Sequence, residues 1–252
     1  MSIRLKNIWF KYPGMDKWVL ENISYEFKER NIYVIIGPNG SGKTTLFKIA
    51  SLIYRPLKGS VFTWDRDFWR LKDKEALALR RKIVYVHEKP VFLYGSVLYN
   101  VAYGLIIRGY GKEDAFRKAR DYINELGLTY LLNKNIDELS AGEAQLVSLV
   151  RALILEPRMI FLDEPLAHID IEKRKIVLDL IFGLRERIGI AIATHDIYLA
   201  YTLADEIVLV ENGKIKIVER EDLLHKTMFQ RKITRYTYIA DVLEKHNDIS
   251  YH

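Results

Sequence analysis

Short apolar segments alternate along the chain with segments of helical character. Residues 32–36 (IYVII) form a continuous apolar run, and similar runs occur in KIVYV, RMIFLDEP and GIAIATHD. Because a strand buried on both faces shows no polar alternation, these runs predict strands of a parallel sheet. Residues 3–10 and 19–27 also read as strands, with a turn between them. In DEIVLVENGKIKIVE, Asn212 and Gly213 mark a hairpin turn.

The helical segments lie between these strands and in one long stretch. Residues 44–51 and the segment DKEALALRR are predicted helices, and residues from about 96 to 155 lack strong strand signals. Strands that alternate with helices indicate an α/β fold with a parallel sheet covered by helices. We expect one domain over residues 1–220, interrupted by a helical subdomain at about 88–155, and a short extension over 221–252.

Composition narrows the class of protein. The 252 residues are 49% hydrophobic, carry a net charge of +6 and include no cysteine. A chain of this length can build one large α/β domain or two joined lobes, and disulfides and thiolate metal sites are excluded. The first residues lack the apolar core of a signal peptide, and no run approaches the ~18 apolar residues of a membrane span. We therefore expect a soluble chain that reaches a membrane only through a partner.

The segment GPNGSGKTTL directly follows the apolar run at residues 32–36. Glycines let the backbone wrap with N–H groups pointing inward, and a helix starting at Gly42 or Lys43 adds a positive dipole. Lys43 can reach terminal phosphates, and the Thr44 hydroxyl can ligate Mg²⁺. The alternative is a glycine-rich turn with a solvent-facing lysine. The predicted nucleotide-binding residues here are Gly37, Pro38, Asn39, Gly40, Ser41, Gly42, Lys43, Thr44 and Thr45.

Three further polar residues end two of the predicted strands. RMIFLDEP places Asp163 and Glu164 at one strand end, and IAIATHD places His195 at another. In a parallel sheet the carboxyl ends of strands line the ligand crevice. We expect Asp163 to hold Mg²⁺, Glu164 to orient the attacking water and His195 to contact the γ-phosphate. The alternatives are a pair of acids that cap a strand and a structural histidine.

The segment LSAGEAQLVSLVRAL supports two interpretations. Ser140 and Glu143 have the spacing of a capping box ahead of an apolar helix. A helix N-terminus with Ser140 and Gly142 is also a candidate second anion site. The two interpretations are compatible. A chain with two phosphate sites suggests that the second one serves a neighbouring molecule.

Taken together, the phosphate loop, LSAGE, IFLDEP and ATH resemble the nucleotide-binding subunits of ABC transporters, over residues from about 3 to 215. The resemblance implies a P-loop NTPase with a mostly parallel core sheet, an N-terminal antiparallel β subdomain and a helical insert. It assigns a nucleotide-binding signature to LSAGE, whose residues after the leucine are Ser140, Ala141, Gly142 and Glu143. Ala141 replaces the family's first glycine, a change that costs little where φ is negative.

The same resemblance implies roles for two more residues. Tyr12, in FKYPG, is similar to the aromatic residue that stacks on adenine; the alternative is a structural tyrosine at a strand end. Asp170, in LAHID, resembles the aspartate that faces the partner subunit. Both are therefore expected to lie near bound nucleotide.

The segment VYVHEKPVF departs most from the family pattern. Relatives carry a glutamine there that touches Mg²⁺, and counting back from Pro90 puts Glu88 at that position. A glutamate oxygen can still ligate Mg²⁺, but it adds a negative charge near the phosphates. We therefore hypothesise that Glu88, Thr44 and Asp163 form the metal site.

As a function, the resemblance implies ATP hydrolysis with Mg²⁺ by a head-to-tail homodimer, each ATP lying between two copies. The partners implied are integral membrane permease subunits, docked near VFLYGSVLYNVAYGL, and a solute-binding protein, with the chain on the cytoplasmic face of the membrane. A domain without fused spans favours import over export. The sequence does not identify the solute, although SVLYNVAYGLIIRG is similar to subunits that import oxyanions such as tungstate.

The alternative is a soluble ATPase of the same type, in a cluster-assembly, cell-division or nucleic-acid complex. Lys and Arg are scattered among Asp and Glu, which favours an ordinary solvated surface over a nucleic-acid-binding face. The chain also lacks the long heptad segment that chromosome-type relatives require. We therefore expect no nucleic-acid partner.

Overall fold

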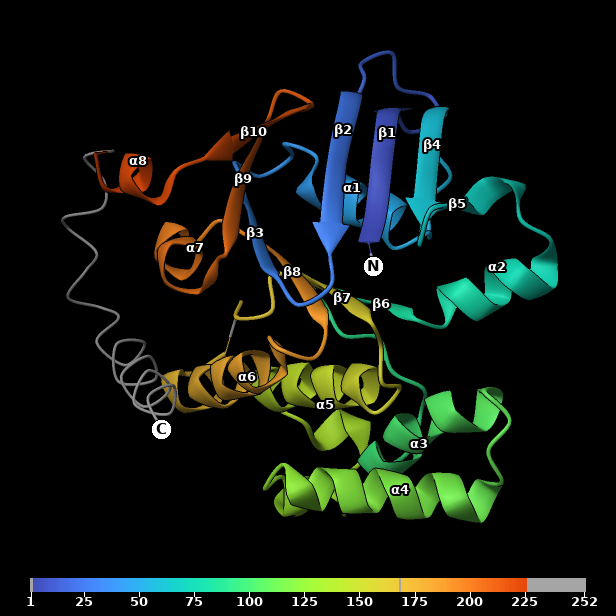
Figure 1. Ribbon diagram of the computed structural model, residues 1–252. Helices are drawn as coiled ribbons and strands as arrows, with labels where there is room; N and C mark the ends of the chain where they lie inside the picture. Colours follow the sequence, from blue (N-terminus) through green and yellow to red (C-terminus); the bar gives the residue numbers. More distant parts are fainter. Residues whose placement is uncertain (1, 168, 226–252) are drawn as a thin grey trace.

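Two β-sheets form the framework of the protein. The computed structural model describes residues 2–167 and 169–225 (Figure 1). The six-stranded sheet runs in the order β10 (Lys214–Val218), β9 (Glu206–Glu211), β3 (Ile32–Ile36), β8 (Gly189–Thr194), β7 (Met159–Asp163) and β6 (Ile83–Val86). The four-stranded sheet runs in the order β2 (Leu20–Lys28), β1 (Ser2–Phe10), β4 (Lys58–Thr63) and β5 (Arg66–Asp67).

Helices connect the strands and cover the six-stranded sheet. The α-helices are α1 (Lys43–Ala50), α2 (Asp73–Arg80), α3 (Val97–Ile107), α4 (Lys112–Glu125), α5 (Ala141–Leu153), α6 (Ile171–Leu184), α7 (Ile197–Leu203) and α8 (Arg220–His225). Short 3₁₀ turns occur at Phe68–Arg70, Thr129–Leu131 and Ile136–Glu138. Among the described residues, no helix combines the length and apolar character needed to cross a bilayer.

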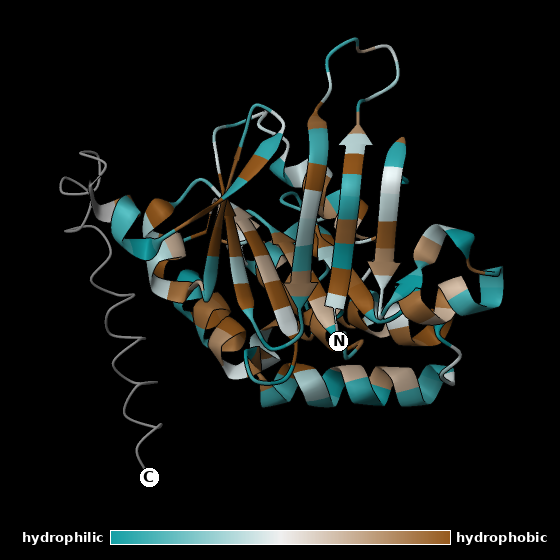
Figure 2. Cartoon of the chain, turned by 45° about the horizontal axis from the view of Figure 1, so that its top comes forward, coloured by the Kyte–Doolittle hydropathy of each residue, from teal (hydrophilic) through white to brown (hydrophobic). Residues whose placement is uncertain are grey.

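The predicted α/β class is confirmed strand by strand. β3, β8, β7, β6 and β9 pair in parallel, and β10 pairs antiparallel with β9. All residues of β3, β7 and β8 are buried, as continuous apolar runs predict. The four-stranded sheet is antiparallel throughout. Its strands show alternating hydropathy in Figure 2, because one face packs inward and the other meets solvent.

Successive residues of the parallel strands enter two separate cores. In β3, Ile32 and Val34 pack with the side chains of α5, α6 and α7, whereas Tyr33 and Ile35 pack with α1 and the antiparallel sheet. Figure 1 shows the same layering, with α5 and α6 on one side of the six-stranded sheet and β1, β2 and β4 on the other. The six-stranded sheet is therefore the central layer of the protein.

The helical insert and the hairpin also match the sequence. Residues between β6 and β7 form α3, α4 and α5 with connecting turns and no strand longer than an isolated bridge. Asn212 has φ 48° and Gly213 has φ 73°, the two positive values that a type I′ turn requires. At the chain end, α8 buries Leu223 in the helical core, so residues 220–225 pack on the main body. The rest of the expected extension, residues 226–252, lies outside the described residues.

Phe161 connects the two sheets and supplies a test of this packing. It is fully buried in β7, with ring centroids 5.2 Å from Phe27 of β2 and 5.1 Å from Phe47 of α1. We expect Phe161→Ala to lower the free energy of unfolding by about 3–5 kcal/mol, because it leaves a cavity where three elements meet. Urea unfolding measures the change. Ile217→Ala, at a position 55% exposed, is the control and should stay within about 0.5 kcal/mol. A loss below about 1 kcal/mol for Phe161→Ala would contradict this account.

Candidate nucleotide-binding site

The loop between β3 and α1 approaches its neighbours too closely for any residue but glycine at two points. A Cβ on Gly37, where φ is 154°, would lie 2.2 Å from the Val210 carbonyl oxygen of β9. Gly42 has φ 110° and caps α1, and a Cβ there would lie 3.0 Å from the Val19 carbonyl oxygen. The loop backbone therefore passes close to β9 and to Val19, just before β2, and leads directly into the N-terminus of α1.

Lys43 lies inside this loop. Its side chain is almost fully buried, and Nζ donates to the carbonyl oxygens of Gly37 at 2.8 Å and Pro38 at 3.1 Å. Burial lowers the pKa of the Lys43 ammonium, while the nearby carboxylates of Glu164, Asp163 and Glu88 oppose that shift. The Lys43 ammonium therefore lies near several carboxylates, at a position where it could neutralise the negative charge of a nucleotide's phosphates.

An open cleft of about 790 Å³ gathers most of the predicted residues. Its lining comprises Tyr12, Met15, Val19, Asn39, Gly40, Gly42, Lys43, Thr44, Thr45, Glu88, Asp163, Glu164, Ala167, Arg174 and His195. The phosphate loop, both strand-end acids and the histidine thus face one space, although 156 residues separate Asn39 from His195 in sequence. A cleft of this size accommodates a nucleotide.

Asp163 accepts two hydrogen bonds on one oxygen. The Thr44 hydroxyl donates to Oδ2 at 2.8 Å, and the Tyr85 hydroxyl donates to the same atom at 2.7 Å. Burial, together with the charge of Asp163, raises the pKa of Tyr85, so its hydroxyl stays protonated and acts as the donor. The Asp163 side chain is itself buried at the end of β7.

Glu164 adopts a left-handed backbone conformation, with φ 46°. Its N–H donates to the Ala193 carbonyl oxygen at 2.8 Å, which holds the turn against β8. One carboxylate oxygen accepts from the Thr194 hydroxyl at 3.1 Å, and the other lies 2.9 Å from His195 Nδ1. Non-glycine residues in this region cost about 1–3 kcal/mol and cluster at functional sites. The turn aims the Glu164 carboxylate at His195, whose side chain is 69% exposed.

The donor set near Asp163 suits a hard cation. Within the described residues, no group of three or more His, Cys, Asp or Glu side chains could hold a metal ion alone. The cleft instead offers the Thr44 hydroxyl and the carboxylates of Asp163 and Glu88. Mg²⁺ is usually held by one or two carboxylates together with phosphate oxygens and water, so these residues fit Mg²⁺ bound with a nucleotide.

Tyr12 is half-buried at the mouth of the cleft. Its hydroxyl lies 2.9 Å from the Thr45 hydroxyl oxygen, which ties the ring to α1. Its ring meets Phe10 edge-on at 5.3 Å and Tyr54 edge-on at 6.1 Å. The ring is therefore fixed by three neighbours and lines the cleft beside Val19.

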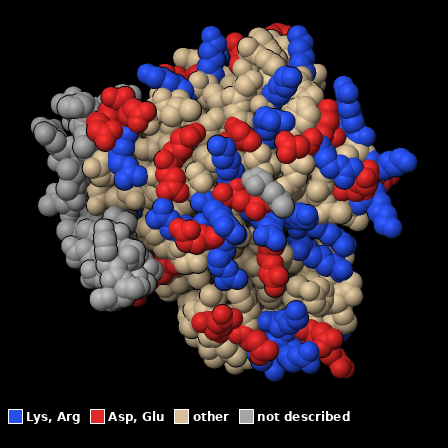
Figure 3. Space-filling view, viewed as in Figure 1, with Lys and Arg blue, Asp and Glu red and all other residues tan. Residues whose placement is uncertain are grey.

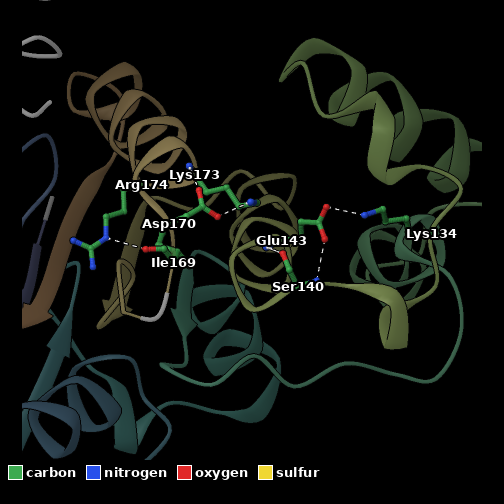
Figure 4. Close-up of polar contacts among 7 residues, drawn as sticks. All are labelled: Lys134, Ser140, Glu143, Ile169, Asp170, Lys173 and Arg174. Carbon is green, nitrogen blue, oxygen red and sulfur yellow. Dashed lines mark hydrogen bonds and ion pairs between the residues drawn. The ribbon is translucent and has the colours of Figure 1, made fainter.

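The LSAGE segment lies apart from this cleft. The predicted capping box is confirmed at the start of α5: the Glu143 N–H donates to the Ser140 hydroxyl, and the Ser140 N–H donates to the Glu143 carboxylate. Ala141 begins the helix with a negative φ, and Lys134 pairs with Glu143 at 2.7 Å. Figure 4 shows these contacts beside the start of α6.

Asp170 lies next to that segment and caps α6. It accepts from the Lys173 N–H at 2.9 Å and from Lys173 Nζ at 2.6 Å (Figure 4). A Cβ on Gly142 would lie 2.6 Å from Lys173 Cδ, so the lysine stem crosses Gly142 closely. Ser140, Gly142 and Asp170 thus form a second surface that does not line the cleft of the same chain.

Several residues in the cleft were not predicted from the sequence. Met15, Val19 and Arg174 line it, and Thr194 and Tyr85 bond to the strand-end acids. Thr194 directly precedes His195, so its strand-end position was a usable signal. For Tyr85 the sequence shows only a hydroxyl within an apolar strand. Which residue that hydroxyl bonds depends on how the strands pair.

Comparison with known proteins gives one consistent result. Residues 20–167 match the family described as ABC transporter. An ABC transporter ATP-binding protein of Pyrococcus abyssi is 34% identical over 217 residues, which cover 85% of this chain and 82% of that protein. The phosphate import ATP-binding protein PstB 2 of Natronomonas pharaonis is 33% identical over 207 residues, covering 78% and 73%.

Solved structures of ATP-binding cassettes have the same fold as this chain. The dimeric post-hydrolysis state of the ATP-binding cassette MJ0796, bound to ADP and Pi, has a TM-score of 0.76 and 26% identity, over 86% of this chain and 98% of that one. The structure of cbiO1 from Clostridium perfringens, part of the transporter complex cbiONQ, has a TM-score of 0.77 and 22% identity, over 96% and 98%. The second likeness concerns the fold alone.

The Lys134–Glu143 pair predicts a pH-dependent effect on stability. Burial alone would raise the pKa of Glu143, but the Lys134 ammonium and the Ser140 hydrogen bonds outweigh it and lower that pKa. A carboxyl group with a lowered folded-state pKa stabilises the protein above its unfolded pKa, and this contribution is lost as the pH falls through the folded value. Lys134→Met should therefore cost up to about 1 kcal/mol at pH 7, since solvent screens the partly exposed lysine.

The measurement is urea unfolding of wild type and variant between pH 3 and 7. The difference should shrink below about pH 4.3, the ordinary pKa of Glu. Lys74→Met, at an exposed site on α2, is the matched control and should show no pH-dependent difference. A Lys134→Met effect of equal size at all pH values would contradict the role given to the ion pair.

Proposed function

Because the chain belongs to the ABC transporter family and is an ATP-binding ABC ATPase, we propose that it powers a transporter by closing head to tail with a second copy around ATP. One observation carries this proposal. The cleft gathers Tyr12, most of the phosphate loop, the strand-end acids and His195, whereas the LSAGE segment and Asp170 lie on a separate surface. A second copy can supply that segment, and the dimeric state of the similar cassette MJ0796 supports such pairing.

In the proposed dimer, the residues of one cleft divide the work. Lys43 and the N–H groups at the start of α1 bind the phosphates, and Tyr12 supplies a fixed ring for the base. Glu164 orients the attacking water, and His195, held at Nδ1 by Glu164, presents its other ring nitrogen to the γ-phosphate. The Ser140 hydroxyl and the α5 N-terminus of the second copy complete the phosphate site. Asp170 faces the same junction.

Mg²⁺ is proposed as the resident metal, held by Thr44, Asp163 and Glu88 with the phosphates. Its chemistry would be to neutralise charge that develops on the transferred phosphoryl group. The Thr44 hydroxyl and the Asp163 carboxylate already lie 2.8 Å apart, so both can reach one ion. Glu88 is exposed at the cleft edge and contributes to the field around Lys43.

The helical insert offers a surface on which a membrane partner could dock. We propose that residues 1–220 form the ATPase domain and that the insert at about 88–155 docks the permease subunits. Next to Glu88, a groove of about 240 Å³ is lined by His87, Val91, Tyr103 and Ile107, among others. Val91 is 69% exposed and Tyr94 is 96% exposed, an apolar surface suited to a short helix of a permease. The chain would then lie on the cytoplasmic face of the membrane.

Import is the proposed direction. Relatives with import in their names include the phosphate protein PstB 2 and an Fe(3+) ion protein, FbpC 1, of Haemophilus influenzae, 30% identical. A solute-binding protein is the expected further partner, and the solute class stays a hypothesis. A soluble complex of the same fold is the second candidate. In Figure 3, Lys and Arg are interspersed with Asp and Glu over the face in view. This distribution argues against a nucleic-acid-binding surface on that face.

Glu164→Gln tests the role proposed for this carboxylate. The amide keeps the shape of the side chain but cannot accept a proton, so we expect ATP-dependent dimers without turnover. Gel filtration with ATP and Mg²⁺ reports the dimer, and phosphate release reports turnover, expected to fall at least ~100-fold. Glu113→Gln, on the exposed start of α4, is the control. Normal hydrolysis by Glu164→Gln, or monomers at saturating ATP, would refute the assignment.

Variants of Glu88 test its place in the metal site. We expect Glu88→Ala to raise the Mg²⁺ concentration for half-maximal ATPase activity several-fold, and Glu88→Gln to remain active, because its amide oxygen can still ligate the ion. Steady-state ATPase assays over a Mg²⁺ series provide the values. An unchanged Mg²⁺ dependence and turnover in Glu88→Ala would show that the residue is not a ligand.

A further inference from the structure

Tyr85 occupies a position that strand pairing aims at the proposed metal site. In the parallel pair β6–β7, Tyr85 lies opposite Phe161, and Asp163 follows Phe161 by two residues. Side chains two residues apart on a strand share a face, so Tyr85, Phe161 and Asp163 point the same way, toward α1. A tyrosine is long enough to cover the diagonal between neighbouring strands. Its hydroxyl meets Asp163 Oδ2 at 2.7 Å.

Two donors from different elements thereby converge on a single carboxylate oxygen. Thr44 donates from α1 and Tyr85 from β6, both to Oδ2. Within the part of the chain that the structure describes, no hydrogen bond reaches Oδ1 of Asp163. A carboxylate with two rotatable bonds is thus fixed in one orientation, with one oxygen held by protein donors and the other available to an ion.

The ring of Tyr85 is itself held on its other side. It meets the His87 imidazole edge-on, with centroids 4.5 Å apart. A half-buried tyrosine held at the ring and at the hydroxyl has little rotational freedom, which makes it a rigid support for the carboxylate.

We propose that Tyr85 is a positioning residue for the metal site, whose hydroxyl orients Asp163 so that Oδ1 meets Mg²⁺. The inference rests on the proposed function, because it assumes that Asp163 ligates a nucleotide-bound ion. Tyr85 itself touches neither ion nor nucleotide. Its loss should therefore weaken only the contribution of Mg²⁺ and leave the metal-free binding of nucleotide unchanged.

The test is a binding measurement on the full chain, with no turnover required. In a Glu164→Gln background, ATP affinity is measured calorimetrically with Mg²⁺ and with EDTA, and the ratio gives the gain due to the ion. Tyr85→Phe keeps the ring and removes the hydroxyl. We expect it to keep the EDTA affinity within twofold and to reduce the Mg²⁺ gain about tenfold, the size typical of losing a hydrogen bond that orients a metal ligand.

Two further variants separate this role from a packing effect. Tyr33→Phe removes another buried hydroxyl, which accepts from the Lys28 N–H far from the cleft, and should leave the Mg²⁺ gain unchanged. In an Asp163→Asn background, Tyr85→Phe should cause no additional loss, because its partner carboxylate is already gone. Tyr85→Leu offers an independent replacement if the phenylalanine variant unfolds, with thermal melts as the check.

The outcomes distinguish a failure of the role given to Tyr85 from a failure of the proposed metal site. An unchanged Mg²⁺ gain in Tyr85→Phe, with a clear gain in the parent, overturns the role of Tyr85 and leaves the proposed function intact. If Tyr85→Phe reduces the Mg²⁺ gain by the same factor in the Asp163→Asn background as in the parent, the role of Tyr85 is also overturned. A parent protein that binds ATP no better with Mg²⁺ than with EDTA overturns the proposed metal site and this inference together.

Discussion

The parallel register of β3, β8, β7 and β6 is the constraint on which the whole site depends. Parallel strands end at the same edge, so whatever follows them in sequence is brought together there. Pairing of Ile36 with Thr194, and of Asp163 with Ala193, aligns the ends of three strands. The phosphate loop, the two acids and the histidine meet for this reason alone. A shift of one residue would turn Asp163 to the opposite face of the sheet.

Charge within the cleft is balanced only in part by the chain itself. Lys43 is buried against carbonyl oxygens and faces several carboxylates, including that of Glu88. Such a site favours a ligand that brings both negative phosphates and a divalent cation. The surface around Ser140 does not line that cleft, and its Glu143 carboxylate is paired locally with Lys134.

Support for the site reaches beyond the residues that line it. Asp163 is held from α1 and from β6, and Glu164 is held from the end of β8, so each acid is fixed by a different element. Tyr85 and His87, whose rings are in contact, belong to the segment that also lines the groove beside the helical insert. One short segment thus connects the proposed docking surface with the support of Asp163. Close packing of this kind can carry a displacement from the groove to Asp163.

The sequence by itself determined the α/β class, the hairpin at Asn212 and Gly213, the capping box at Ser140 and the identity of most cleft residues. These features depend on local pattern, since burial on two faces, turn geometry and helix caps leave marks within a few residues. Only the tertiary structure decided that Tyr85 bonds Asp163, that Lys173 crosses Gly142 and that LSAGE lies outside its own cleft. Those relations join residues distant in sequence, and strand register and helix packing set them without any local signal.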